Sequence, residues 1–246
     1  MERFPTKRTF RPFRCARLNW RRDSLERSFT RRDHRDSTIR STRDTDILSG
    51  MEPRVDSVST AWAARLISEL DDADQRAKDL VKGLTSLQLN WRPTQEAWSV
   101  GQCLEHLRAT NEVYLPAISA SLAARPLLAV PDIALGWFGR WFIRNYIEPS
   151  SQSKRARAPK KIAPGARVDP RILDLFLSSN QAARELVRRA SDCDVNRVRF
   201  KNPFIPVLRF TVGTGLEIVS RHQRRHLLQA ERVKQTRDFP VRECDR

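Results

Sequence analysis

"STAWAARLISELDDADQRAKDLVKGL", residues 59–84, is the first stretch of the chain in which apolar residues recur every three or four positions. Residues at this spacing share one face of a helix, so the stretch predicts an amphipathic helix with one buried side. Ser59 is a candidate N-cap, and Gly83 lies near the C-terminal end of the pattern. The predicted buried stripe consists of Trp62, Leu66, Leu70, Ala73, Ala77, Leu80, Val81 and Leu84.

Three further segments have the same periodicity, and each begins with a helix start signal. Ser99 and Gln102 have the spacing of a capping box, in which each side chain satisfies the backbone N–H of the other residue. An Asp-Pro pair before the third segment is typical of an N-cap followed by the first helical position. These predicted helices run from Ser99 to about 124, from Asp169-Pro170 to about 191, and from Thr211 or Thr214 to about Lys234.

Four helices of about 20–25 residues, with no convincing strand between them, predict an all-α four-helix bundle. The connection between the second and third helices, residues 126–168, is much longer than a tight helix–helix turn. A connection of this length lets the two helices run parallel, whereas a short turn would make them antiparallel. We therefore expect a helical domain over residues 57–236, with an insertion at 126–168 and a short tail at 237–246.

The first half of the insertion contains the aromatic stretch "LGWFGRWFIRNYI", residues 135–147. We expect it to form a short helix, and its role is open between a lid beside a site, a homodimer contact and a plain cover over the bundle. A membrane-surface helix is a further option. The second half, "SSQSKRARAPKKIAPGARV", residues 150–168, is basic and contains two prolines, which predicts an extended segment.

The formal net charge is +17, and residues 1–50 contain 14 Lys and Arg against 7 Asp and Glu. Residues 1–56 lack hydrophobic periodicity and are expected to be a disordered, Arg-rich extension. One interpretation is a basic tail that binds nucleic acid or membranes. An organelle transit peptide is a second interpretation, but seven acidic residues argue against it. The preferred interpretation is that Met51 is the true initiator and that the preceding residues are dispensable, so we discount His34.

The cysteines and the hydropathy predict a reducing, cytoplasmic location. The four cysteines are scattered, with no Cys-x-x-Cys pair, which argues against a disulfide framework or a cysteine-based zinc finger. The most apolar window, residues 126–143, is interrupted by proline and charged residues and is too short to cross a bilayer. The N-terminus has no apolar core of a secretory signal.

The most informative motif is "RHQRRHLLQAER", residues 221–232, in which His222 and His226 lie one helical turn apart. Imidazoles at this spacing share a helix face and can bind one ion. His106 lies within the second predicted helix, and facing helices of a bundle commonly build metal sites. Three protein ligands leave one coordination position open, as in catalytic zinc sites. The ligand set does not distinguish zinc, nickel or iron.

Other interpretations of these residues remain open at the level of sequence. The two histidines share a face with Val219, Gln229 and Val233, so a hydrogen-bonded core pair also fits. The neighbouring arginines lie mostly on the other faces; they are Arg221, Arg224, Arg225 and Arg232. Cys103 is either a fourth ligand or, as we expect, a small core residue. Gln223 occupies the position of the catalytic Glu in an H-E-x-x-H metalloprotease, which argues against that class.

Four passages together resemble the DinB-like superfamily, over about Ser57 to Lys234. They are "LNWRPTQEAWSVGQCLEHL" (89–107), "KRARAPKKIAP" (154–164), "RVRFKNPFIP" (197–206) and "HQRRHLLQAERV" (222–233). The resemblance implies a four-helix bundle of up-down-down-up topology. It also implies a divalent metal held by His106 from the second helix and by His222 and His226 from the last.

The resemblance further implies metal-dependent transfer or isomerisation with a low-molecular-weight thiol, such as bacillithiol, mycothiol or glutathione. A bound cation deprotonates a coordinating thiol, so such chemistry needs no protein base. The predicted function is therefore a thiol-dependent S-transferase acting on an electrophilic substrate. The alternative is a non-catalytic helical module whose basic surfaces bind nucleic acid or another polyanion. The absence of a recognised DNA-binding motif argues against nucleic acid.

Overall fold

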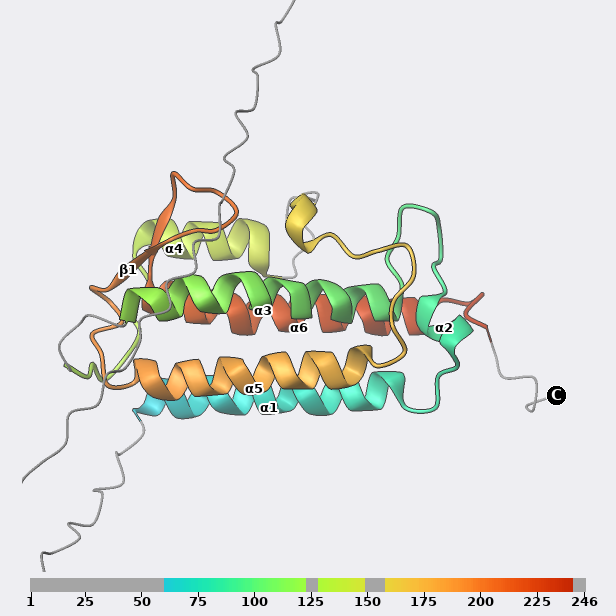
Figure 1. The fold of residues 1–246 in the computed structure, drawn as a ribbon, viewed down its shortest axis with the longest axis horizontal. Coiled ribbons are helices and arrows are strands. Elements are labelled where there is room, and N and C mark those ends of the chain that lie inside the picture. The colour runs from blue at the N-terminus through green and yellow to red at the C-terminus, as the bar shows by residue number, and fades with distance from the viewer. Residues whose placement is uncertain (1–59, 123–127, 149–157, 241–246) are drawn as a thin grey trace, which may run out of the picture. The chain divides into compact units, whose positions relative to one another are not determined.

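The computed structural model describes residues 60–122, 128–148 and 158–240, all within the unit Arg54–Arg246. Its main elements are four long helices, which form the predicted four-helix bundle (Figure 1). The predicted extension at 1–56, the candidate cap Ser59 and residues 241–246 of the predicted tail lie outside the described residues. The bundle helices are α1 (Ala61–Val81), α3 (Val100–Leu122), α5 (Ile172–Ala190) and α6 (Val212–Lys234).

The topology is up-down-down-up, as the resemblance implies. Helices α1 and α6 run in one direction, and α3 and α5 run in the other (Figure 1). Each of α1 and α3 packs against both α5 and α6. Hydrogen bonds join Asn111 of α3 to Asn180 of α5 and, further along both helices, Ser119 to Arg189. The order of these pairs shows that α3 and α5 are parallel neighbours, which confirms the interpretation of the long connection.

Local capping signals place most of the helix ends. Before α3, the Ser99 side chain accepts from the Gln102 N–H at 3.1 Å, and the Gln102 side chain accepts from the Ser99 N–H at 3.0 Å, which confirms the capping box. The Thr211 side chain caps α6. After α1, Gly83 adopts a φ of 71°, a left-handed conformation that suits glycine at a helix end. Helix α5 begins at Ile172, because a turn closed at Asp169 precedes it.

The connections contain four short helices among the described residues. They are α2 (Ser86–Asn90), α4 (Trp137–Phe142), the π-helix η1 (Ile143–Ile147) and the 3-10 turn η2 (Lys160–Ile162). The aromatic stretch therefore forms a short helix, as predicted. Its inner residues Phe138 and Phe142 contact the ring of Phe210, while Trp137 and Trp141 are exposed. Its role as lid, dimer contact or membrane helix stays a prediction.

The expectation of no strands was wrong in the segment between α5 and α6. Strands β1 (Arg199–Lys201) and β2 (Arg209–Thr211) form an antiparallel hairpin in which Phe200 pairs with Phe210. Each strand has only three residues, which is too short for an alternating pattern to stand out in the sequence. Both phenylalanines are buried in the core of the bundle, so tertiary packing supplies what local periodicity does not.

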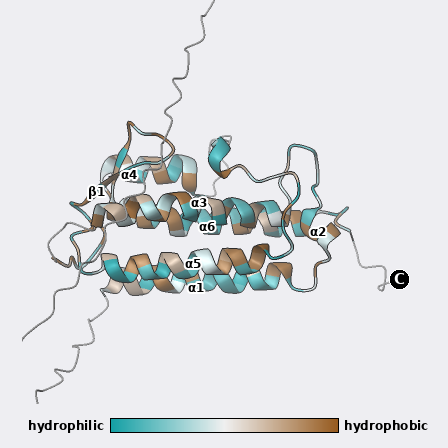
Figure 2. Ribbon diagram, in the orientation of Figure 1, coloured by the Kyte–Doolittle hydropathy of each residue, from teal (hydrophilic) through white to brown (hydrophobic). Residues whose placement is uncertain are grey.

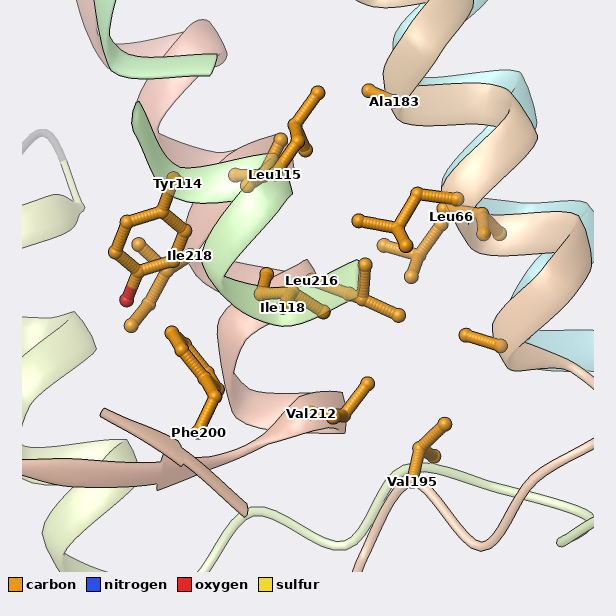
Figure 3. Packing of buried hydrophobic residues seen from close by; sticks show 14 of the residues in the cluster. Leu66, Tyr114, Leu115, Ile118, Ala183, Val195, Phe200, Val212, Leu216 and Ile218 are labelled. Atoms are coloured by element: carbon orange, nitrogen blue, oxygen red, sulfur yellow. The ribbon is translucent and has the colours of Figure 1, made fainter. Parts of the chain in front are cut away.

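The apolar core consists of two clusters, one toward each end of the bundle. In Figure 2 both hydrophilic and hydrophobic residues appear along each bundle helix, as amphipathic helices require. Figure 3 shows the first cluster, in which Tyr114 and Ile118 of α3 meet Leu216 of α6 and Phe200 of the hairpin. The second cluster surrounds Leu104, Phe176 and Leu227, all fully buried.

A layer of buried polar side chains lies between the two apolar clusters. Each bundle helix contributes at least one side chain to this layer. The central member is Asn180, whose side chain is fully buried. The layer consists of Asp74 from α1, Asn111 from α3, Asn180 and Arg184 from α5 and Gln223 from α6. No helix of the described part of the chain is long and apolar enough to span a membrane.

Candidate metal centre

The antiparallel packing of α3 and α6 brings together the three histidines that the sequence singled out. One potential ligand atom from each of His106, His222 and His226 lies within 4.8 Å of the other two. The Nε2 atom of His222 is 3.2 Å from that of His106 and 3.0 Å from that of His226. Within the described residues, no other group of three or more His, Cys, Asp or Glu side chains has its potential ligand atoms this close to one another.

The outer ring nitrogens of two histidines are fixed by hydrogen bonds. The Nδ1 of His106 donates to the backbone carbonyl of Ile162 at 2.8 Å, and the Nδ1 of His226 contacts Oε1 of Gln229 at 2.9 Å. A carbonyl oxygen can only accept, so in both rings Nδ1 carries the proton and Nε2 presents a lone pair. Hydrogen bonds of this kind orient metal-ligating histidines and fix their tautomer.

This arrangement of protons tests whether the site suits a metal. His222 has at most one proton on Nε2, so it can donate to His106 or to His226 but not to both. Without a cation, one nitrogen–nitrogen contact near 3 Å would therefore face two lone pairs toward each other. Nitrogens bound tetrahedrally at about 2.0–2.1 Å to zinc lie about 3.3–3.4 Å apart, close to the separations observed. The donor set fits a divalent cation better than it fits a hydrogen-bonded core cluster.

The environment also keeps the imidazoles neutral. Burial lowers the pKa of His106, although its bond to Ile162 opposes the shift. Burial lowers the pKa of His226 to about 3, with the neighbouring His106 adding to the effect. The pKa of His222 is well below its usual value because of burial, the two other histidines and the charge of Arg225. All three rings are neutral at neutral pH, as metal ligation requires.

The returning end of the long insertion positions the carbonyl that holds His106. The Ile162 side chain is buried, which anchors η2 against the bundle. Gln102, besides its part in the capping box, donates to the carbonyl of Gly165 at 2.7 Å, and the N–H of Val168 donates to Asn90 at 2.8 Å. The described part of the segment that was predicted to be extended, residues 158–168, thus includes the turn η2 and is tied to both α2 and α3.

An aromatic side chain forms one wall of the site. The ring of Trp98 lies 4.8 Å from that of His106 and 5.5 Å from that of His226, stacked on the latter at 28°. Trp98, His222 and Gln229 are all half-buried, so solvent reaches the cluster on their side. A separate groove of about 540 Å³ lies between α3 and α5, and none of the three histidines lines it.

Two other sequence expectations concern residues beside the cluster. Cys103 is fully buried among apolar side chains, and burial raises the pKa of its thiol to about 12, so it is a core residue as expected. Gln223, at the position of a metalloprotease Glu, is also buried and exchanges two hydrogen bonds with Asn180 in the polar layer. It therefore faces the interior of the bundle and is not available as a base at the histidines.

Sequence reasoning missed several contributors to the site. The Ile162 carbonyl carries no sequence signal, because every residue has one. Trp98 belongs to a motif that carried the resemblance, yet its spacing to the histidines gave it no role. Arg225 was grouped with the other arginines and given no role, but its charge lowers the pKa of both His222 and His226. Its spacing of three residues from His222 is the signal that identifies it.

This chain is similar to one protein family and to two other proteins. A family model described as the DinB superfamily matches residues 69–230, a range that contains all three histidines. The uncharacterized protein YuaE of Bacillus subtilis (strain 168) is 22% identical over 162 residues, which cover 63% of this chain and 88% of that protein. The solved structure of YfiT from Bacillus subtilis, described as "a probable metal-dependent hydrolase with an unusual four-helix bundle topology", is 19% identical, with a TM-score of 0.48 over 73% of this chain and 90% of that one.

Proposed function

The chain belongs to the DinB superfamily, and on that premise we propose that it is a metal-dependent enzyme that transfers a low-molecular-weight thiol to a small electrophile. His106, His222 and His226 hold a divalent cation such as zinc, nickel or iron. The observation that carries the proposal is that the Nε2 atom of His222 lies 3.2 Å from that of His106 and 3.0 Å from that of His226. At most one proton, on Nε2 of His222, is available for these two contacts. A cation that accepts all the lone pairs satisfies this arrangement.

The bound cation supplies a nucleophile near neutral pH, because it lowers the pKa of a thiol or water that it binds. The protein contributes position and surroundings. Ile162 and Gln229 hold two imidazoles in the tautomer that presents Nε2. The indole of Trp98 packs against the rings of His106 and His226, and the half-buried side near His222 admits the substrates.

The lack of a base at the cluster favours a thiol over water as the nucleophile. Within the described residues, the cluster of potential ligands contains no Asp, Glu or Cys. Gln223 is not a base and is engaged by Asn180. An ordinary thiol has a pKa of about 8.5, whereas bulk water has one of about 15.7, so a thiol needs a far smaller shift to ionise at neutral pH. This chemistry suits a site that provides a cation and little else.

The first test measures metal content in the full chain purified without an affinity tag. We expect one divalent ion per chain. Loss of a residue that only hydrogen-bonds to a metal ligand lowers metal affinity by roughly 10–100-fold. His226→Gln removes a ligand itself, so its metal affinity should fall by more than that. His34→Gln, which changes the histidine outside the described residues, is the matched control and should retain the ion. An unchanged ion content in His226→Gln would refute the site.

The second test separates thiol transfer from hydrolysis. The metal-loaded chain is given glutathione or mercaptoethanol with a chromogenic aryl halide, and in parallel p-nitrophenyl acetate without thiol. We expect the wild-type chain to consume the aryl halide in a metal-dependent reaction, and we expect His226→Gln to lose this activity. Metal-dependent ester hydrolysis without any thiol transfer would refute the proposed reaction while leaving the metal site intact.

A further inference from the structure

A cation shares the helix face that carries the metal centre. His222, Arg225 and His226 lie at i, i+3 and i+4 of α6, and this spacing puts their side chains on one face of the helix. The guanidinium of Arg225 is half-buried. It is close enough for its charge to lower the pKa of both histidines.

Arg225 has no carboxylate partner among the described residues. Its single hydrogen bond there runs from Nη1 to the backbone carbonyl of Glu148, at 3.2 Å. A guanidinium has five N–H donors, so most of its donor capacity is unused. Arg221, one turn earlier on the same helix, shows the contrast, because it pairs with the carboxylates of both Glu148 and Glu217.

This contrast argues against a purely structural role for Arg225. A charge withdrawn from water without an opposite charge is unfavourable, and burial lowers the pKa of Arg225 accordingly. The Glu148 side chain is within reach of this region but binds Arg221 instead. The bond to the Glu148 carbonyl holds the guanidinium in place while leaving its remaining donors for another group. An arginine kept in this state is suited to bind a carboxylate or phosphate through paired hydrogen bonds.

We propose that Arg225 binds an anionic group, most simply a carboxylate, on the thiol that occupies the open side of the metal centre. This inference rests on the proposed function. The thiol sulfur lies at the cation held by the three histidines, and the carboxylate of the same molecule pairs with Arg225. The site thereby selects acidic thiols over neutral ones of similar size.

The experiment compares two thiols on the cobalt-loaded full chain, using the absorption band that a thiolate gives on binding cobalt. Mercaptopropionate carries a carboxylate, and mercaptoethanol is a neutral probe of similar size. We expect the wild-type chain to bind mercaptopropionate about 10- to 100-fold more tightly, the range for a hydrogen bond to a charged group. Arg225→Gln should bind both thiols with similar affinity.

Arg224→Gln is the matched control, because Arg224 is the adjacent arginine, is exposed and forms no ion pair with a described residue. It should keep the preference for mercaptopropionate. A wild-type chain without the preference, or an Arg225→Gln chain that retains it, would overturn the inference, as would an equal loss in both variants. Helical circular dichroism and cobalt content confirm that each variant is folded and loaded.

Cobalt content also separates this inference from the proposed function. If the wild-type chain bound no cobalt, the metal site itself would be wrong. The anion site would then be measured on the metal-free chain, by calorimetric titration of mercaptopropionate into wild-type and Arg225→Gln protein. Equal binding by the two, or no binding by either, would refute the role of Arg225 as well.

Discussion

Replacement of Asn180 by alanine tests the polar layer that joins the four bundle helices. The Asn180 amide uses its full hydrogen-bonding capacity. Its Oδ1 accepts from Asn111 at 3.1 Å and from Gln223 at 2.6 Å, and its Nδ2 donates to Asp74 at 2.6 Å and to Gln223 at 3.0 Å. Truncation removes all four bonds from a site with no exposure to solvent.

The size of the loss follows from what the partners retain. Gln223 loses both bonds while remaining buried, which costs about 1–3 kcal/mol. The Asp74 carboxylate loses the hydrogen bond from Asn180, and a bond of this kind to a charged group is worth about 1.5–3 kcal/mol. Asp74 keeps its bond from Arg184 at 2.8 Å. Asn111 keeps the hydroxyl of Ser179 at 3.1 Å. We therefore expect Asn180→Ala to lower the free energy of unfolding by about 3–5 kcal/mol.

Urea unfolding followed by circular dichroism measures this quantity. Ser179→Ala is the matched control, because Ser179 is the preceding residue, is half-buried and gives Asn111 only its second partner. It should cost no more than about 1 kcal/mol. A loss below about 1 kcal/mol in Asn180→Ala, or equal losses in the two variants, would show that the polar layer does not hold the helices together as argued.

Two further predictions concern pH and packing. The pKa of His226 is about 3 in the folded chain and about 6.5 when unfolded. The contribution of the neutral His226 to the free energy of unfolding is therefore full above pH 6.5 and is lost as the pH falls toward 3. The metal-free wild type should therefore lose more stability than His226→Gln between pH 7 and pH 5, and parallel losses in urea titrations would contradict this. Gly215→Ala places a Cβ 2.6 Å from Phe200 and should cost about 1–3 kcal/mol, whereas Gly136→Ala meets no atom within 4 Å and should be nearly neutral by thermal unfolding.

The sequence determined the helices and one half of the site. Apolar periodicity predicted the four long helices, and the pair Ser99 and Gln102 predicted the start of α3, because both signals involve residues within a turn or two of each other. The spacing of His222 and His226 placed them together for the same reason. The long insertion allowed α3 and α5 to run parallel, since chain length limits how two helices can be joined.

Tertiary structure alone decided what surrounds the histidines. The carbonyl of Ile162 meets His106 from 56 residues away, and Asn180 meets Asp74 from 106 residues away. Such contacts depend on how the helices pack. The sequence does not show which backbone carbonyl or which asparagine will be buried beside a given partner. Arg225 differs from Arg221 for this reason too, because only the folded chain shows which of the two arginines has carboxylates opposite it.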